Sequence, residues 1–162
     1  MKNIKKGDLM KKVCLISSSG GHYEELMKLK PLEKKYKVFV VTEKTKYNND
    51  DPGIDYYLYQ TNRREILCFF KIIINLVKSF VIFLKEKPDV IISTGVLSTI
   101  PMLFIGHIFK KKIIYIESIA NVYIPTRTGR FIYKMGLADR FYVQWKSLLK
   151  HYPTAIYEGR VY

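Results

Sequence analysis

Short apolar runs alternate along the chain with longer segments whose apolar residues recur at helical spacing. The short runs predict strands at residues 13–16, 38–41, 56–59, 90–92, 112–116, 140–143 and 155–157. The longer segments predict helices at residues 22–32, 63–85, 98–109 and 129–135. Strands separated by helices of this length indicate βαβ units and a parallel sheet that is covered on both faces. The pattern therefore predicts a doubly wound α/β domain over residues 11–162.

Neither the N-terminal residues nor the two cysteines indicate a functional site. Met10 begins a second plausible start, so we expect residues 1–10 to be a mobile extension. They do not resemble a secretory signal, because no apolar stretch follows the lysines. Cys14 and Cys68 fall within apolar segments and have no metal-ligand spacing, which predicts buried free thiols in a reducing cytosol and no metal site.

The charge balance indicates a polyanionic partner. Lysine and arginine number 28 against 14 acidic residues, a net charge of +14. Such an excess suits nucleic acid, an anionic bilayer or a phosphorylated substrate. The 13 tyrosines and 9 phenylalanines are as typical of a membrane headgroup interface as of RNA binding. Composition alone leaves these partners open.

The segment at residues 63–85 combines an apolar surface with a narrow basic stripe. Arg64, Lys71, Lys78 and Lys85 recur every seven residues, and most of the other positions are apolar. A helix on a sheet needs only one apolar face. A length of about 33 Å could cross a bilayer, but four regularly placed charges make crossing costly. We expect a helix in the membrane interface with its stripe toward anionic headgroups; the alternative is a buried helix with a solvated stripe.

The first strand is followed by a turn of small residues and a histidine. Ser19, Gly20 and Gly21 allow a ligand to approach the backbone closely. The turn matches neither a Walker loop nor a dinucleotide fingerprint, and an ordinary strand–helix turn remains the alternative. His22 could act as a base or as a donor to phosphate, or it could be structural.

Two further strands end in polar residues. Ser93, Thr94 and Gly95 follow one strand, and Glu117 and Ser118 follow the next. Ligands of doubly wound folds bind beyond the carboxyl ends of the strands, so all three turns are candidate sites. A buried carboxylate at Glu117 requires a partner. The alternative is a structural ion pair between Glu117 and Arg127 or Arg130.

Four blocks of the sequence together resemble a known family. They are SSSGGHYEEL, PDVIISTG, IYIESIANVYIPTRTGRFIYKMGLADRFYVQW and YPTAIYEGRVY. The chain from Met10 onward is similar to the acceptor-side subunit of split glycosyltransferases. That family includes the membrane-anchoring subunit of the N-acetylglucosaminyltransferase of dolichol-linked glycan assembly, with bacterial relatives in capsule and exopolysaccharide assembly. The bacterial branch looks closest, because no separate N-terminal membrane anchor precedes the first block.

The resemblance implies a Rossmann-like domain equivalent to the N-terminal half of a GT-B glycosyltransferase. In the single-chain relative that makes the peptidoglycan lipid intermediate, this half holds the lipid-diphosphate acceptor and the other half holds the UDP-sugar. The chain would then be one subunit of an inverting transferase, inactive alone and without a cofactor. Its partners would be a separate donor-binding subunit, a polyprenyl-diphosphate-linked saccharide and the cytoplasmic face of the cell membrane.

The resemblance also assigns roles to the candidate residues. Gly20, Gly21 and His22 would line the acceptor side of the cleft, with His22 as the base unless the partner subunit supplies one. Ser93, Thr94 and Gly95 would lie near the acceptor diphosphate, and Glu117 and Ser118 would line the cleft floor. Basic residues between 127 and 140 would dock to anionic lipid or to the partner. The alternatives are a non-catalytic scaffold, a stand-alone small transferase and a nucleic-acid-binding protein, although no recognised nucleic-acid module is present.

Overall fold

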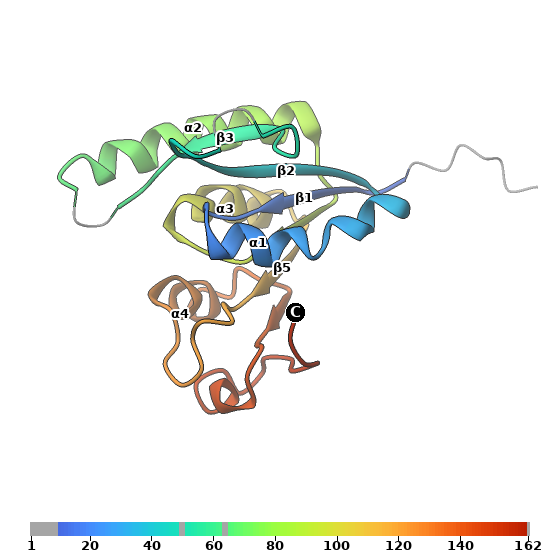
Figure 1. Cartoon of the computed structure of the whole chain (residues 1–162), viewed down its shortest axis with the longest axis vertical. Helices are drawn as coiled ribbons and strands as arrows, with labels where there is room; N and C mark the ends of the chain where they lie inside the picture. Colours follow the sequence, from blue (N-terminus) through green and yellow to red (C-terminus); the bar gives the residue numbers. More distant parts are fainter. Residues whose placement is uncertain (1–9, 49–50, 63–64, 162) are drawn as a thin grey trace, which may run out of the picture.

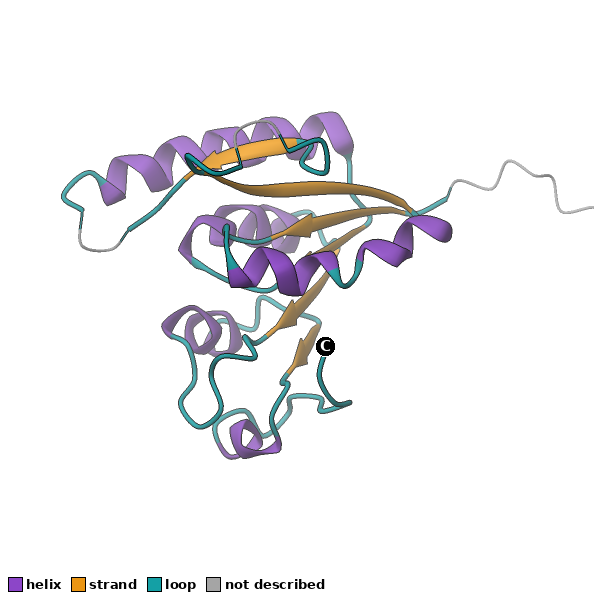
Figure 2. Ribbon diagram, viewed as in Figure 1, coloured by secondary structure: helices purple, strands orange, loops and turns teal. Residues whose placement is uncertain are grey.

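A single parallel sheet organises the chain (Figure 2). The computed structural model describes residues 10–48, 51–62 and 65–161, so nearly all of the expected extension at residues 1–10 lies outside it. The strands lie in the order β3-β2-β1-β4-β5-β6. Their bounds are β1 Lys12–Ile16, β2 Lys37–Lys44, β3 Tyr56–Tyr59, β4 Val90–Ser93, β5 Lys112–Ile116 and β6 Arg140–Tyr142. This order is that of a doubly wound Rossmann-like fold, which confirms the fold predicted from sequence.

Helices cover both faces of the sheet (Figure 1). The α-helices are α1 Gly21–Met27, α2 Cys68–Glu86, α3 Ile100–Ile108 and α4 Arg127–Lys134. Short 3-10 helices form at η1 Lys30–Lys34, η2 Leu97–Thr99 and η3 Lys146–Lys150. One core lies between the sheet and α2, α3 and α4, and a second lies beneath α1, η1 and the C-terminal segment.

Strand residues alternate between the two cores. In β1, Cys14 and Ile16 join the core under α2 and α3, whereas Val13 and Leu15 join the core under α1. Burial on both faces explains the nearly continuous apolar runs in the strands. It also raises the pKa of the Cys14 thiol. Both cysteines are free and buried, as predicted.

Two predicted helices differ from the structure by more than two residues at one end. The helix expected at residues 22–32 ends at Met27, and η1 begins at Lys30. Pro31 explains the break, because a proline has no backbone N–H and its ring collides with the carbonyl four residues earlier. The helix expected at residues 63–85 begins at Cys68 and ends at Glu86; residues 63 and 64 lie outside the described residues.

The prediction of a strand at residues 155–157 is wrong. Ile156 forms only an isolated parallel bridge with Tyr142. Ile156 N donates to Phe141 O and Ile156 O accepts from Val143 N, and the pairing with β6 does not extend beyond this bridge.

A buried asparagine attaches α2 to the edge strand β3. The Asn75 side chain accepts a hydrogen bond from Tyr59 N at 2.8 Å and donates one to Tyr59 O at 2.9 Å. These backbone groups lie on the outer side of β3, which pairs with β2 on its inner side. Asn75 therefore completes the hydrogen bonding of an edge strand that would otherwise be open to another chain.

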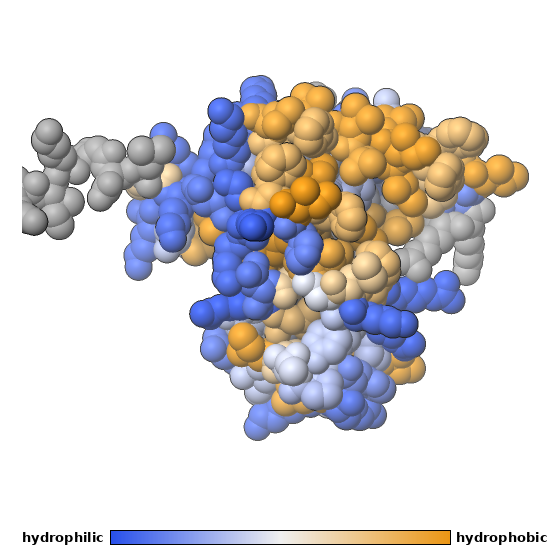
Figure 3. All heavy atoms as spheres, turned by 180° about the vertical axis from the view of Figure 1, so that it is seen from behind, coloured by the Kyte–Doolittle hydropathy of each residue, from blue (hydrophilic) through white to orange (hydrophobic). Residues whose placement is uncertain are grey.

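The outward face of α2 is apolar (Figure 3). Its large exposed residues are Phe69, Phe70, Ile73, Ile74, Leu76, Val77, Phe80, Val81 and Leu84. The surface continues onto α3 through Phe104, Ile108 and Phe109. The ring of Phe109 lies 6.4 Å from that of Phe80 and 4.9 Å from that of Phe83, between centroids. We call this the α2–α3 apolar face. None of the helices in the described part of the chain combines the length and the apolar character needed to cross a membrane.

The lysine stripe lies at the border of this face, and its contact with anionic headgroups stays a prediction. Lys78 Nζ lies 4.7 Å from the centroid of the Tyr59 ring, and Lys85 Nζ lies 5.2 Å from that of Tyr56. Lys71 forms an ion pair with Glu65, and Arg64 lies outside the described residues. The stripe is turned toward β3 because its aromatic side chains attract the ammonium groups.

We predict that Asn75→Ala lowers the free energy of unfolding by about 1–3 kcal/mol, because two backbone groups of Tyr59 lose their partner. Urea unfolding followed by circular dichroism measures the change. Val77→Ala on the outward face of the same helix is the control and should change stability by less than about 0.5 kcal/mol. Equal effects of the two substitutions would contradict this role of Asn75.

Candidate functional site

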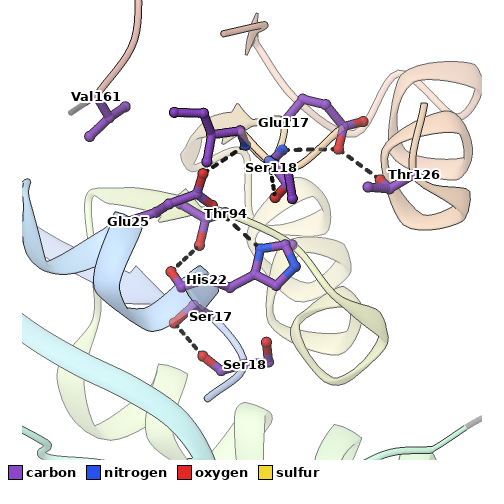
Figure 4. Close-up of polar contacts among 12 residues, drawn as sticks. Ser17, Ser18, His22, Glu25, Thr94, Glu117, Ser118, Thr126 and Val161 are labelled. Carbon is purple, nitrogen blue, oxygen red and sulfur yellow. Dashed lines mark hydrogen bonds and ion pairs between the residues drawn. The ribbon is translucent and has the colours of Figure 1, made fainter. Parts of the chain in front are cut away.

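The strand order reverses direction between β1 and β4, and two of the predicted site turns meet there. β1 and β4 are neighbours, with Ile16 paired to Ser93. Doubly wound folds bind their ligands in the crevice at this switch point. Thr94 Oγ1 donates a 2.9 Å hydrogen bond to the carbonyl oxygen of His22, which joins the turn after β4 to the start of α1 (Figure 4). The switch point therefore brings His22 and Thr94 together.

Gly95 allows close contact between the two turns. Its φ of +101° lies in the region that favours glycine, and Gly95 N donates to Ser93 Oγ at 3.1 Å. A Cβ at this position would lie 3.1 Å from the Tyr115 hydroxyl oxygen and 3.8 Å from His22 Cε1. The His22 ring thus lies beside the backbone of Gly95, and a larger residue there would crowd it.

The glycine turn after β1 opens onto a cavity of about 520 Å³. Gly20 has a φ of +73°, and its carbonyl oxygen accepts hydrogen bonds from Tyr23 N and Glu24 N. A Cβ at Gly21 would meet no atom of the described chain within 4 Å. The cavity is lined by Ser19, Gly20, Tyr23, Thr45, Lys46, Tyr47, Asn48 and Gln60.

Sequence reasoning missed the contribution of the turn after β2 to this cavity. The sequence analysis assigned no role to Lys46 and Tyr47. The rule that ligands bind beyond the carboxyl ends of parallel strands could have found them, because β2 neighbours β1 in the sheet.

Glu117 is buried inside the domain next to α4. Its carboxylate accepts hydrogen bonds from Ser118 N at 3.0 Å, Thr126 Oγ1 at 2.8 Å and the Tyr152 hydroxyl at 2.8 Å. Thr126 also caps α4 by accepting from Gly129 N. The carboxylate of Glu117 therefore stabilises the start of α4, where the helix dipole favours negative charge.

Hydrogen bonds replace the ion pair that was the alternative for Glu117. In the described part of the chain, Glu117 forms no ion pair with Arg127 or Arg130. Burial and the neighbouring Glu117 carboxylate raise the pKa of the Tyr152 hydroxyl, so this group stays protonated and remains a donor. Ser118 is also buried, and its Oγ accepts from Ala120 N at 3.3 Å.

Glu25 is a second buried carboxylate, which sequence reasoning did not single out. Its Oε1 accepts from Ile119 N at 2.7 Å and from Gln144 Nε2 at 3.0 Å (Figure 4). Gln144 Nε2 also donates to the carbonyl oxygen of Glu117 at 3.0 Å. The other oxygen, Oε2, lies 3.6 Å from His22 Nδ1. Glu25 thus connects the helix that carries His22 to the segments after β5 and β6.

The predicted residues therefore separate into three groups. Ser19, Gly20, Gly21 and His22 lie at the start of α1, and Ser93, Thr94 and Gly95 lie opposite them across the switch point. Glu117 and Ser118 lie below the surface at the end of β5, one strand further along the sheet. Lys78 and Lys85 lie on α2 beside the β3 rings, and Lys71 on the same helix pairs with Glu65. No cluster of metal-ligating side chains occurs among the residues that the structure describes.

The chain has the same fold as about half of each of two larger enzymes with solved structures. MurG from Acinetobacter baumannii matches 85% of this chain with a TM-score of 0.68 and 16% identity. UDP-N-acetylglucosamine 2-epimerase from Rickettsia bellii matches 94% of it with a TM-score of 0.67 and 16% identity. The chain spans 42% and 45% of the length of these enzymes. The fold and its switch-point turns define one Rossmann-like half of the GT-B class.

The chain belongs to the Alg14-like family of oligosaccharide biosynthesis proteins, whose family model matches residues 57–161. A human relative, UDP-N-acetylglucosamine transferase subunit ALG14, is 26% identical over 92% of this chain and 82% of its own length. It and the relatives from mouse and Candida albicans are eukaryotic proteins, so they give no support to the expected capsule or exopolysaccharide setting.

Proposed function

We propose that this chain is the acceptor-binding subunit of a two-component inverting glycosyltransferase that acts on a polyprenyl-diphosphate-linked saccharide. The observation that carries the proposal is the switch point, where His22, Thr94 and Gly95 meet next to the Ser19–Gly20 turn and its cavity, in a domain that resembles one half of a GT-B fold. The other half of such a fold would come from a separate donor-binding subunit. The printed name of the human relative, a subunit of a UDP-N-acetylglucosamine transferase, supports this division.

The residues around the crevice suit a diphosphate with an attached sugar. Gly20 and Gly21 leave room for a ligand to approach the backbone, because no side chain covers them. Lys46 lines the cavity beside Ser19 and Gly20 and would provide a charge-assisted contact to a phosphate oxygen. The net charge of +14 would attract the anionic acceptor over a longer range.

The α2–α3 apolar face suits a lipid-linked acceptor. Its residues project outward from α2 and α3, and lysines lie at one border. A helix of this kind lies in a membrane interface with its apolar face in the lipid and its cationic groups at the headgroups. The acceptor would then reach the crevice while its polyprenyl chain stays in the bilayer.

The proposed setting of the reaction is a membrane surface. Peripheral association with the cytoplasmic face of a membrane follows from the sequence resemblance and from the apolar face. The capsule or exopolysaccharide setting stays a prediction from sequence that the relatives do not support. Donor specificity would reside on the other subunit, so this chain does not identify the sugar.

We predict transferase activity only when this chain is combined with a donor-binding subunit. The assay follows transfer from UDP-[14C]GlcNAc to undecaprenyl-diphosphate-GlcNAc in membranes, with this chain alone and with candidate donor-domain proteins of the same genome. Gly21→Val should lower turnover about tenfold or more, because the new side chain meets no protein atom and would occupy acceptor space.

Glu24→Val, an exposed change on the same helix, is the control and should keep its activity. Activity of this chain alone would contradict the half-enzyme proposal. Full activity of Gly21→Val in the pair would favour a scaffold that does not contact the acceptor.

We predict that Val81→Glu lowers binding to phosphatidylcholine–phosphatidylglycerol vesicles about tenfold, or ~1.4 kcal/mol. The substitution places a charge on the α2–α3 apolar face, where Val81 is 57% exposed. Met135→Glu is the matched control, because Met135 is 52% exposed at the end of α4. Vesicle flotation measures both variants. Equal binding by the two variants, or RNA binding without vesicle binding, would contradict a membrane role for this face.

A further inference from the structure

His22 and Glu25 form a buried pair beside the crevice. They lie three residues apart on α1, and Glu25 Oε2 lies 3.6 Å from His22 Nδ1 (Figure 4). Both atoms are buried, and neither has a hydrogen-bond partner among the described residues. Leaving both groups unpaired costs free energy. Catalytic hydrogen bonds are often long without substrate and shorten when it binds, so the two atoms suit each other as partners.

The Glu25 carboxylate cannot easily turn away from the ring. Its Oε1 accepts two hydrogen bonds, from Ile119 N at 2.7 Å and from Gln144 Nε2 at 3.0 Å. Gln144 is itself held, because its Oε1 accepts from Val161 N at 3.0 Å. With Oε1 held by two segments outside α1, Oε2 remains directed at Nδ1.

The remaining atoms of the His22 ring lie toward the switch point, beside Gly95. The His22 side chain is 25% exposed although its Nδ1 is buried, so its exposure falls on other atoms of the side chain. Thr94 Oγ1 fixes the carbonyl oxygen of His22, and the backbone of Gly95 lies beside Cε1. Glu25 at Nδ1 and the backbone of Gly95 at Cε1 thus limit where Nε2 can lie.

We propose that Glu25 is a positioning residue that holds His22 as the Nδ1–H tautomer, which leaves the Nε2 lone pair free to accept a proton. This inference rests on the proposed function. The acceptor O–H bond breaks and its proton passes to Nε2, while the acceptor oxygen bonds to the anomeric carbon of the donor sugar. The nucleoside diphosphate leaves with the electron pair of the broken glycosyl bond. The Glu25 carboxylate would stabilise the imidazolium, which later releases its proton to solvent.

Glu25→Gln tests the tautomer directly. The amide oxygen would keep the two donors at Ile119 and Gln144, so the NH2 group would face Nδ1. The ring would then have to accept at Nδ1 and carry its proton on Nε2, where it could not act as a base. Glu24→Gln makes the same chemical change at an exposed position of the same helix and is the matched control.

The first readout is the ring 15N spectrum of the histidine-labelled full chain at a pH where the histidines are neutral. The chain has three histidines, and the signals of His22 are those lost in His22→Ala. We expect the Nδ1–H tautomer in the wild type and in Glu24→Gln, and the Nε2–H tautomer in Glu25→Gln. A wild-type ring that is mainly Nε2–H overturns the inference without any variant, as does an unchanged tautomer in Glu25→Gln.

The second readout is turnover by the assembled pair. We expect Glu25→Gln to lower kcat by about 10² or more with little change in KM, because a carboxylate-to-amide change in a comparable catalytic pair costs about 10⁴. It should add no further loss to His22→Ala, since both changes remove the same function. Wild-type kcat in Glu25→Gln, or losses that add, would overturn the positioning role.

The two readouts separate this inference from the proposed function. Absence of transfer with every donor-domain partner would refute the proposed function, and the 15N spectrum would still decide whether Glu25 sets the tautomer. Transfer that depends on His22 but not on Glu25 would leave the proposed function standing and overturn the inference.

Discussion

The buried carboxylate of Glu25 is the constraint on which the geometry of the switch point depends. It accepts hydrogen bonds from the segment after β5 and from Gln144 after β6, and it approaches His22 from the same helix. A buried carboxylate without such partners would be strongly unfavourable, so α1 and the far strands must keep their relative positions. The position of His22 relative to the turn after β4 follows from this arrangement.

The switch-point turns and the α2–α3 apolar face both arise from the topology of the sheet. The order reversal between β1 and β4 places small-residue turns at the carboxyl ends of the strands, where a ligand can enter. The crossover from β3 to β4 places α2 over the edge strand, and Asn75 attaches it there. Only a narrow side of α2 is needed for this packing, which leaves the α2–α3 apolar face outward.

The pattern of apolar and polar residues was enough to predict most of the fold and the turns that follow β1, β4 and β5. The apolar runs at β3 and β5 had the bounds found in the structure, because each run is flanked by polar or turn residues that end the strand. The orientation of the lysine stripe could not be predicted, because it depends on Tyr56 and Tyr59 of another element. The burial and hydrogen bonding of Glu25 could not be predicted either, since its donors Ile119 and Gln144 lie 94 and 119 residues away in sequence.

The central proposal is that this chain binds the acceptor and that a separate subunit binds the donor. The most direct test is equilibrium binding by the chain alone to undecaprenyl-diphosphate-GlcNAc in lipid nanodiscs and, separately, to UDP-GlcNAc. The account predicts saturable binding of the lipid-linked sugar above that of empty nanodiscs, and no binding of UDP-GlcNAc. Saturable binding of UDP-GlcNAc, with no preference for nanodiscs that contain the acceptor, would contradict it.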